Sequence, residues 1–119
     1  MSNKLTFGFI YDFRNPPDWP RPLPQLYAEM LDVMVESERL GFGAAWLPEH
    51  HLAADDYVPS PMVVLSALAA RTSMITLGSA IVLAPLYDPV RFAEDCAVLD
   101  IISNGRLEMG LAIGYRRRE

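Results

Sequence analysis

Four short apolar runs alternate with longer helix-like stretches, and this alternation limits the possible folds more than any other feature. A run of four to eight apolar residues between turn-forming residues indicates a strand buried within a sheet. Strands that alternate with helices predict a parallel sheet with right-handed crossovers. The four predicted strands are Leu5 to Tyr11, Ala44 to Leu47, Ile75 to Val82 and Leu107 to Ile113.

The segments between these runs predict three helices, over 24–40, 62–72 and 89–103. Ser60-Pro61 and Asp88-Pro89 each place a capping residue before a proline, which is typical of a helix start. Gly41 and Asn104-Gly105 suit the left-handed conformation that ends a helix.

The spacing of the last strands, about 31 residues, is the size of one βα unit, and eight such units make a barrel of roughly 250 residues. The 119 residues hold three and a half units. The sequence therefore predicts an α/β fold with parallel βαβαβαβ order, half of a (β/α)8 TIM barrel, as a single domain over residues 1–119.

Composition excludes several classes of function. A net charge of −5, with a single basic cluster at Arg116 to Arg118, argues against a nucleic-acid partner. The single cysteine, Cys96, rules out an internal disulfide and fits a reducing compartment. Neither a signal segment nor a membrane-length apolar run is present, so we expect a cytoplasmic protein without a membrane partner.

The second predicted strand leads directly into Glu49, His50 and His51. His50 and His51 are the only histidines in the sequence. In parallel α/β proteins the loops at the carboxyl ends of strands carry the site, and imidazoles suit proton transfer near neutral pH. The alternative is that both histidines are satisfied polar loop residues. Glu49, the histidines and Asp55-Asp56 are metal-ligand types, but adjacent extended residues point apart, so no metal site is expected.

Small residues mark the third predicted strand at Gly78-Ser79-Ala80-Ile81. Small side chains let a flat ligand approach the backbone, and tight helix–sheet packing explains them equally well. A dinucleotide fingerprint is not formed, because Gly41-Phe42-Gly43 follows a helix and the glycines at 110 and 114 have the wrong spacing.

Several motifs occur together in an order that resembles one family, the bacterial luciferase-like flavin-dependent monooxygenases, which are (β/α)8 barrels. The resemblance covers nearly the whole chain. The motifs are Phe7-Gly8-Phe9, Trp46 to His51, Thr76 to Pro85, Asp88 to Arg91, Ala93-Glu94-Asp95, Leu99-Asp100 and Ser103 to Leu107.

The resemblance implies reduced FMN, supplied by a separate reductase, that activates O2 to oxidise a small organic substrate. It implies that His50 assists proton transfer at the reactive edge of the flavin, with Glu49 and His51 as supporting neighbours. Ala80-Ile81 matches a non-prolyl cis peptide that lies against the flavin ring. Gly78 and Ala112 complete the expected cofactor contacts.

Two departures from the family pattern leave alternatives open. Ala112 and Ile113 stand where luciferases carry a reactive cysteine and a phosphate-binding arginine. The chain also stops after the fourth strand, so we expect an N-terminal half-barrel that lacks the C-terminal half and associates as a homo-oligomer through its apolar edges. The alternatives are a non-catalytic half-barrel that self-associates without flavin, and an F420-dependent hydride-transfer oxidoreductase.

Overall fold

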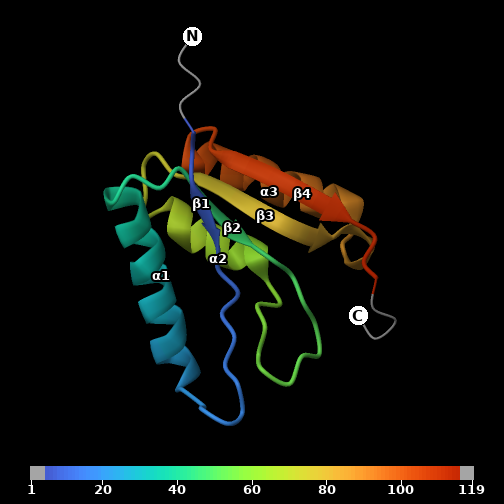
Figure 1. Ribbon diagram of the computed structural model, residues 1–119. Coiled ribbons are helices and arrows are strands. Elements are labelled where there is room, and N and C mark those ends of the chain that lie inside the picture. The colour runs from blue at the N-terminus through green and yellow to red at the C-terminus, as the bar shows by residue number, and fades with distance from the viewer. Residues whose placement is uncertain (1–4, 116–119) are drawn as a thin grey trace.

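A four-stranded parallel sheet forms the centre of the computed structural model, which describes residues 5–115 (Figure 1). Its strands lie in the order β1-β2-β3-β4, and each pairs in parallel with the next. This arrangement confirms the predicted fold class. The elements are β1 Gly8–Ile10, α1 Leu23–Arg39, β2 Ala44–Leu47, α2 Pro61–Ala69, β3 Thr76–Leu83, a 3-10 turn η1 Ala84–Leu86, α3 Pro89–Ser103 and β4 Leu107–Ala112.

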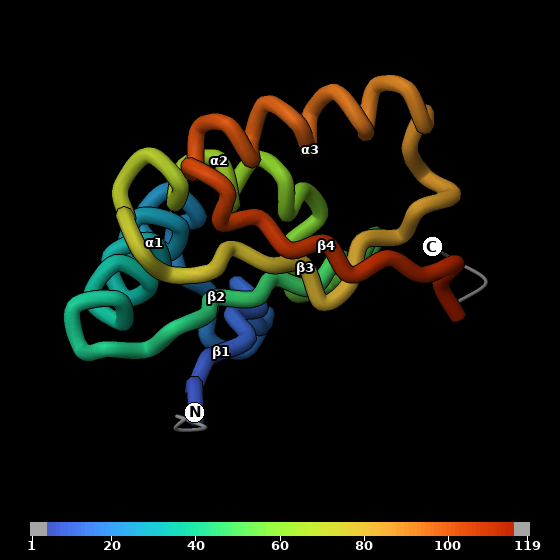
Figure 2. Tube along the Cα trace, turned by 90° about the horizontal axis from the view of Figure 1, so that it is seen from above, coloured from blue at the N-terminus to red at the C-terminus, as the bar shows by residue number. Residues whose placement is uncertain are grey.

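The hydrophobic core lies between the helices and one face of the sheet, and α2 and α3 stack over that face in Figure 2. Alternate residues of the strands point into it, as the twofold period of a strand requires. Burial of these apolar side chains is the main force that holds the layers together. The core includes Met34, Leu65, Leu68 and Leu99 from the helices, and Ala45, Leu47 and Leu77 from the strands.

The opposite face of the sheet has no covering layer among residues 5–115 (Figure 2). The sequence predicted that 5–11 would be a strand buried on both faces, and this was wrong. The strand runs only from Gly8 to Ile10, and Ile10 is 65% exposed. The reason is that β1 is an edge strand with one paired neighbour and one open face.

Helix α3 begins and ends where the sequence predicted. The carboxylate of Asp88 accepts hydrogen bonds from the backbone N–H groups of Val90 and Arg91. At the other end of the helix, Asn104 adopts the left-handed backbone conformation, with φ 60°. Ser60 occupies the equivalent position before α2 but makes no side-chain bond to the helix. Over residues 5–115, no helix is both long and apolar enough to cross a membrane.

Two charged side chains fix the turn that leads from α2 into β3. The guanidinium of Arg106 donates to the backbone carbonyls of Ala69, Thr72 and Ile75. The carboxylate of Glu38 accepts from the N–H groups of residues 73–75. Burial acts to raise the pKa of Glu38, but the N–H bonds from the turn outweigh it and lower that pKa. Both contacts hold the turn directly before β3 begins at Thr76.

Candidate active site

Glu49 is a buried carboxylate just beyond the end of β2, with 2% of its surface exposed. Its Oε2 accepts from the N–H of Leu83 at 2.8 Å, and its Oε1 accepts from the hydroxyl of Tyr87 at 3.0 Å. The same Oε1 lies 2.7 Å from Nε2 of His51. Burying a carboxylate is costly unless donors replace its water, and these three groups do so. The network joins the carboxyl ends of β2 and β3.

His51 is oriented by this carboxylate while part of its ring remains open to solvent. Its side chain is 29% exposed, against 1% for Glu49. An ionised carboxylate only accepts hydrogen bonds, so opposite an ionised Glu49 the donor in this contact would be the Nε2–H of His51. The other ring nitrogen, Nδ1, then keeps its lone pair in the neutral imidazole. A histidine held this way is suited to exchange a proton.

His50 makes different contacts from its neighbour. Its ring meets Tyr57 edge-on, with the ring centroids 4.3 Å apart, and the guanidinium carbon of Arg14 lies 5.3 Å from the Tyr57 centroid. Arg14 is in turn paired with Asp55 at 2.5 Å. His50 also lines a pocket of about 240 Å³ at the start of α1. The two imidazoles therefore have separate partners, as expected of adjacent residues in an extended segment.

The loops around this pocket hold uncommon backbone conformations. Phe13, Leu52 and Asp56 all have positive φ, between 54° and 56°. Non-glycine residues adopt this region at a cost, and such residues gather at functional sites. The N–H of Asn15 donates to the carbonyl of Asp55 at 2.7 Å, which fixes the loop after β1 against the loop after β2.

The third strand has an irregularity at the position that the resemblance singled out. The Ala80–Ile81 peptide bond is cis, and the register with β4 shifts between Ser79 and Val82. The hydroxyl of Ser79 donates to the carbonyl of Gly110 at 2.9 Å and accepts from its N–H at 3.0 Å. This hydroxyl satisfies backbone groups of β4 at the shift. Ile81 is 36% exposed beside it.

Gly78 and Ala112 have different surroundings. A Cβ on Gly78 would lie 2.2 Å from Cε3 of Trp46, so the space above this glycine is filled by the indole ring. The contact is with the neighbouring strand β2 and not with a helix, so it differs from the helix–sheet packing that the sequence offered as the alternative. Ala112 pairs with Leu83, which places it at the carboxyl end of β4 next to the Glu49 network.

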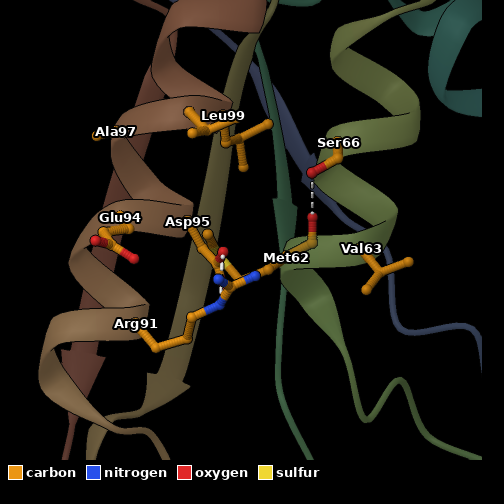
Figure 3. A pocket seen from close by; sticks show the side chains of 9 residues that line it. Met62, Val63, Ser66, Arg91, Glu94, Asp95, Ala97 and Leu99 are labelled. Carbon is orange, nitrogen blue, oxygen red and sulfur yellow. Dashed lines mark hydrogen bonds and ion pairs between the residues drawn. The ribbon is translucent and has the colours of Figure 1, made fainter.

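A larger hollow of about 600 Å³ lies between α2 and α3, in the outer helical layer (Figure 3). Three of its polar residues interact within their own helices: Ser66 donates to the carbonyl of Met62, and Arg91 pairs with Asp95 at 3.3 Å. The predicted site residues do not line it. The candidate active site is therefore the set of residues at the strand ends and not the larger hollow.

Residues 5–119 match the family model of the luciferase-like monooxygenases. The chain belongs to this family. It is 40% identical over 90 residues to the oxygenase component of a flavin-dependent trigonelline monooxygenase from Acinetobacter baylyi, covering 76% of this chain and 25% of that protein.

Two solved structures share the fold of this luciferase-like chain. The oxygenating constituent of 3,6-diketocamphane monooxygenase from Pseudomonas putida, in complex with FMN, superposes with a TM-score of 0.85 at 22% identity. The coenzyme F420-dependent tetrahydromethanopterin reductase of Methanopyrus kandleri superposes with a TM-score of 0.71 at 26% identity. The matches cover 95% and 94% of this chain, but 31% and 28% of those chains. It thus spans a quarter to a third of its relatives.

The sequence analysis missed Tyr87, Tyr57 and Arg14. Tyr87 follows the third strand, at the same end of the sheet as Glu49. Burial, followed by the charge of Glu49, raises the pKa of Tyr87, so its hydroxyl stays protonated. Its place after a strand was the available signal, because loops there gather at one edge.

Proposed function

We propose that this chain is part of a flavin-dependent monooxygenase that oxidises a small organic substrate with reduced FMN and O2. The observation that carries the proposal is the pairing of the buried Glu49 with His51 beside the accessible Ala80-Ile81 segment. Family membership supports the reaction class, and the pairing supplies an oriented imidazole where a ligand can reach it.

The residues at the end of β3 fit a flat ring system. Ala80 carries only a methyl group and is half-buried, and Ile81 presents an apolar surface next to it. Ala80 and Ile81, together with Ala112 of the neighbouring strand, would hold the flavin ring. Gly78 precedes Ala80 in β3 and lies against the Trp46 ring of β2. When bound, the reduced flavin supplies the electrons for the activation of O2.

The protein's part in the proposed reaction is proton transfer and positioning. His50 moves the proton at the reactive edge of the flavin, and Glu49 and His51 support it from the other side of the loop. The Arg14–Tyr57 stack holds the His50 ring from the side. Arg116 to Arg118, the basic cluster of the sequence, lie outside the described residues.

Two kinds of partner follow from the proposal. A separate flavin reductase is expected, because the relative from Acinetobacter baylyi is named as an oxygenase component. A homo-oligomer is expected because Ile10 and Leu111, on the outer strands, leave apolar surface exposed. Sedimentation velocity tests this: a monodisperse monomer contradicts it. The cytoplasmic location stays a prediction from the sequence.

The second candidate function is hydride transfer with F420, favoured by the structural likeness to the reductase from Methanopyrus kandleri. Titration of the chain with FMN and with F420, oxidised and reduced, followed by cofactor fluorescence, separates the candidates. Saturable FMN binding supports the monooxygenase, and binding of F420 alone supports the reductase. A folded chain that binds neither supports the non-catalytic half-barrel.

A matched pair of variants locates the binding. Ala80→Phe fills the space above β3 and is expected to abolish FMN binding. Ala97→Phe places the same side chain on an exposed position of α3 that lines the larger hollow, and is expected to leave binding unchanged. The proposed location is contradicted if both variants lose FMN binding equally, or if neither variant loses it.

A further inference from the structure

Tyr87 contacts the carboxylate that orients His51. The hydroxyl of Tyr87 donates to Oε1 of Glu49, the same oxygen that Nε2 of His51 faces. The Tyr87 ring packs against Phe92 of α3, with the ring centroids 4.9 Å apart, and this contact restrains the orientation of the phenol ring. Burial raises the pKa of Tyr87, with the charge of Glu49 as the next cause, which keeps the hydroxyl a donor at neutral pH.

We infer that Tyr87 is a positioning residue: it fixes the Glu49 carboxylate and, through it, the orientation and tautomer of His51. The inference rests on the proposed function, in which this end of the sheet carries out proton transfer. The N–H of Leu83 holds Oε2 and the hydroxyl of Tyr87 holds Oε1. The carboxylate is therefore fixed at both oxygens, by the backbone of β3 and by the loop that follows it.

The fixed carboxylate selects one tautomer of His51. Donation from Nε2–H leaves the lone pair of the neutral imidazole on Nδ1. Loss of the Tyr87 hydroxyl leaves Oε1 with one donor fewer, and the carboxylate is then restrained mainly by Leu83. We expect the minor tautomer of His51 to become more populated by about two- to tenfold, the factor that corresponds to one ordinary hydrogen bond.

Glu49→Gln provides an opposite and equally specific expectation. The N–H of Leu83 requires an oxygen at the Oε2 position, so the amide NH2 must occupy the Oε1 position. That NH2 group donates to Nε2 of His51, and the hydroxyl of Tyr87 turns to accept. The proton of the imidazole then moves to Nδ1, and the tautomer is inverted.

The test is a long-range ¹H–¹⁵N spectrum of the 119-residue chain labelled at histidine, which contains only two histidines. His50→Gln assigns the two sets of signals. Tyr87→Phe is compared with Tyr11→Phe, because Tyr11 also carries a hydroxyl bonded to a side chain, Ser37 Oγ at 2.5 Å, away from the Glu49 network. Thermal unfolding of both variants shows whether they lose stability to a similar extent.

The expected result is the Nε2–H tautomer of His51 in the unmodified chain, a larger minor population in Tyr87→Phe and inversion in Glu49→Gln. Tyr11→Phe should leave the His51 signals unchanged. The inference is overturned if Tyr87→Phe leaves the His51 signals where they were, or if both tyrosine variants shift them equally. The spectrum needs no flavin, so a failure here is separate from a failure to bind FMN, and either result can occur without the other.

Discussion

Replacing Glu49 with alanine should destabilise the fold far more than replacing an exposed glutamate. The change leaves the N–H of Leu83 and the hydroxyl of Tyr87 without their acceptor inside the protein. An unpaired buried donor costs about 1–3 kcal/mol, and the partly exposed Tyr87 recovers some of this by turning to water. We therefore expect Glu49→Ala to lower the free energy of unfolding by about 2–4 kcal/mol.

The assay is urea unfolding followed by far-UV circular dichroism. Glu36→Ala is the control, because Glu36 is a 48% exposed partner of Arg39 and such surface pairs contribute about 0.5 kcal/mol or less. A difference of less than about 1 kcal/mol between the unfolding free energies of Glu49→Ala and Glu36→Ala would refute this expectation, since the buried network would then contribute no more than a surface pair.

Three further variants test other parts of the structure. Gly78→Ala forces a methyl group into the Trp46 ring and should cost about 1–3 kcal/mol with a shift in tryptophan emission, and an unchanged emission spectrum would contradict the packing. Arg106→Lys loses the fork that reaches three carbonyls and should cost about 2–3 kcal/mol in urea unfolding, whereas a loss below about 0.5 kcal/mol would count against that role. The lowered pKa of Glu38 means that its stabilisation is present above its ordinary pKa of 4.5 and is lost as the pH falls through the lowered value. The free energy of unfolding should therefore fall more steeply below pH 4.5 in the native chain than in Glu38→Gln, by under about 1 kcal/mol because the carboxylate remains partly exposed. Parallel pH curves would exclude the effect.

The order of elements and several of their ends could be predicted from local sequence. The start of α3 could be predicted from Asp88 before Pro89, and its end from Asn104 before Gly105. Capping and left-handed conformations depend on only a few neighbouring residues. The exposure of β1 could not be predicted in this way, because burial depends on which strands and layers lie beside it, and the apolar residues of 8–10 are the same in either case.

The candidate site was predicted in its residue types but not in its contacts. Glu49, His50 and His51 stood out because they follow a strand, whereas their partners come from segments distant in sequence. Tyr87 is 38 residues away from Glu49, and only the parallel pairing of β2 and β3 brings their loops together. The contact between Gly78 and the Trp46 ring could not be predicted either, because it depends on packing between neighbouring strands.

The location of the flavin is the central claim, and amide chemical-shift mapping tests it most directly. The ¹⁵N-labelled chain is titrated with FMN, and the shift of each amide is recorded. The account predicts that the largest shifts fall on His50, His51, Ala80, Ile81 and Ala112, at the carboxyl ends of the strands. Shifts concentrated on Met62, Ser66 and Arg91, around the larger hollow between α2 and α3, would contradict it.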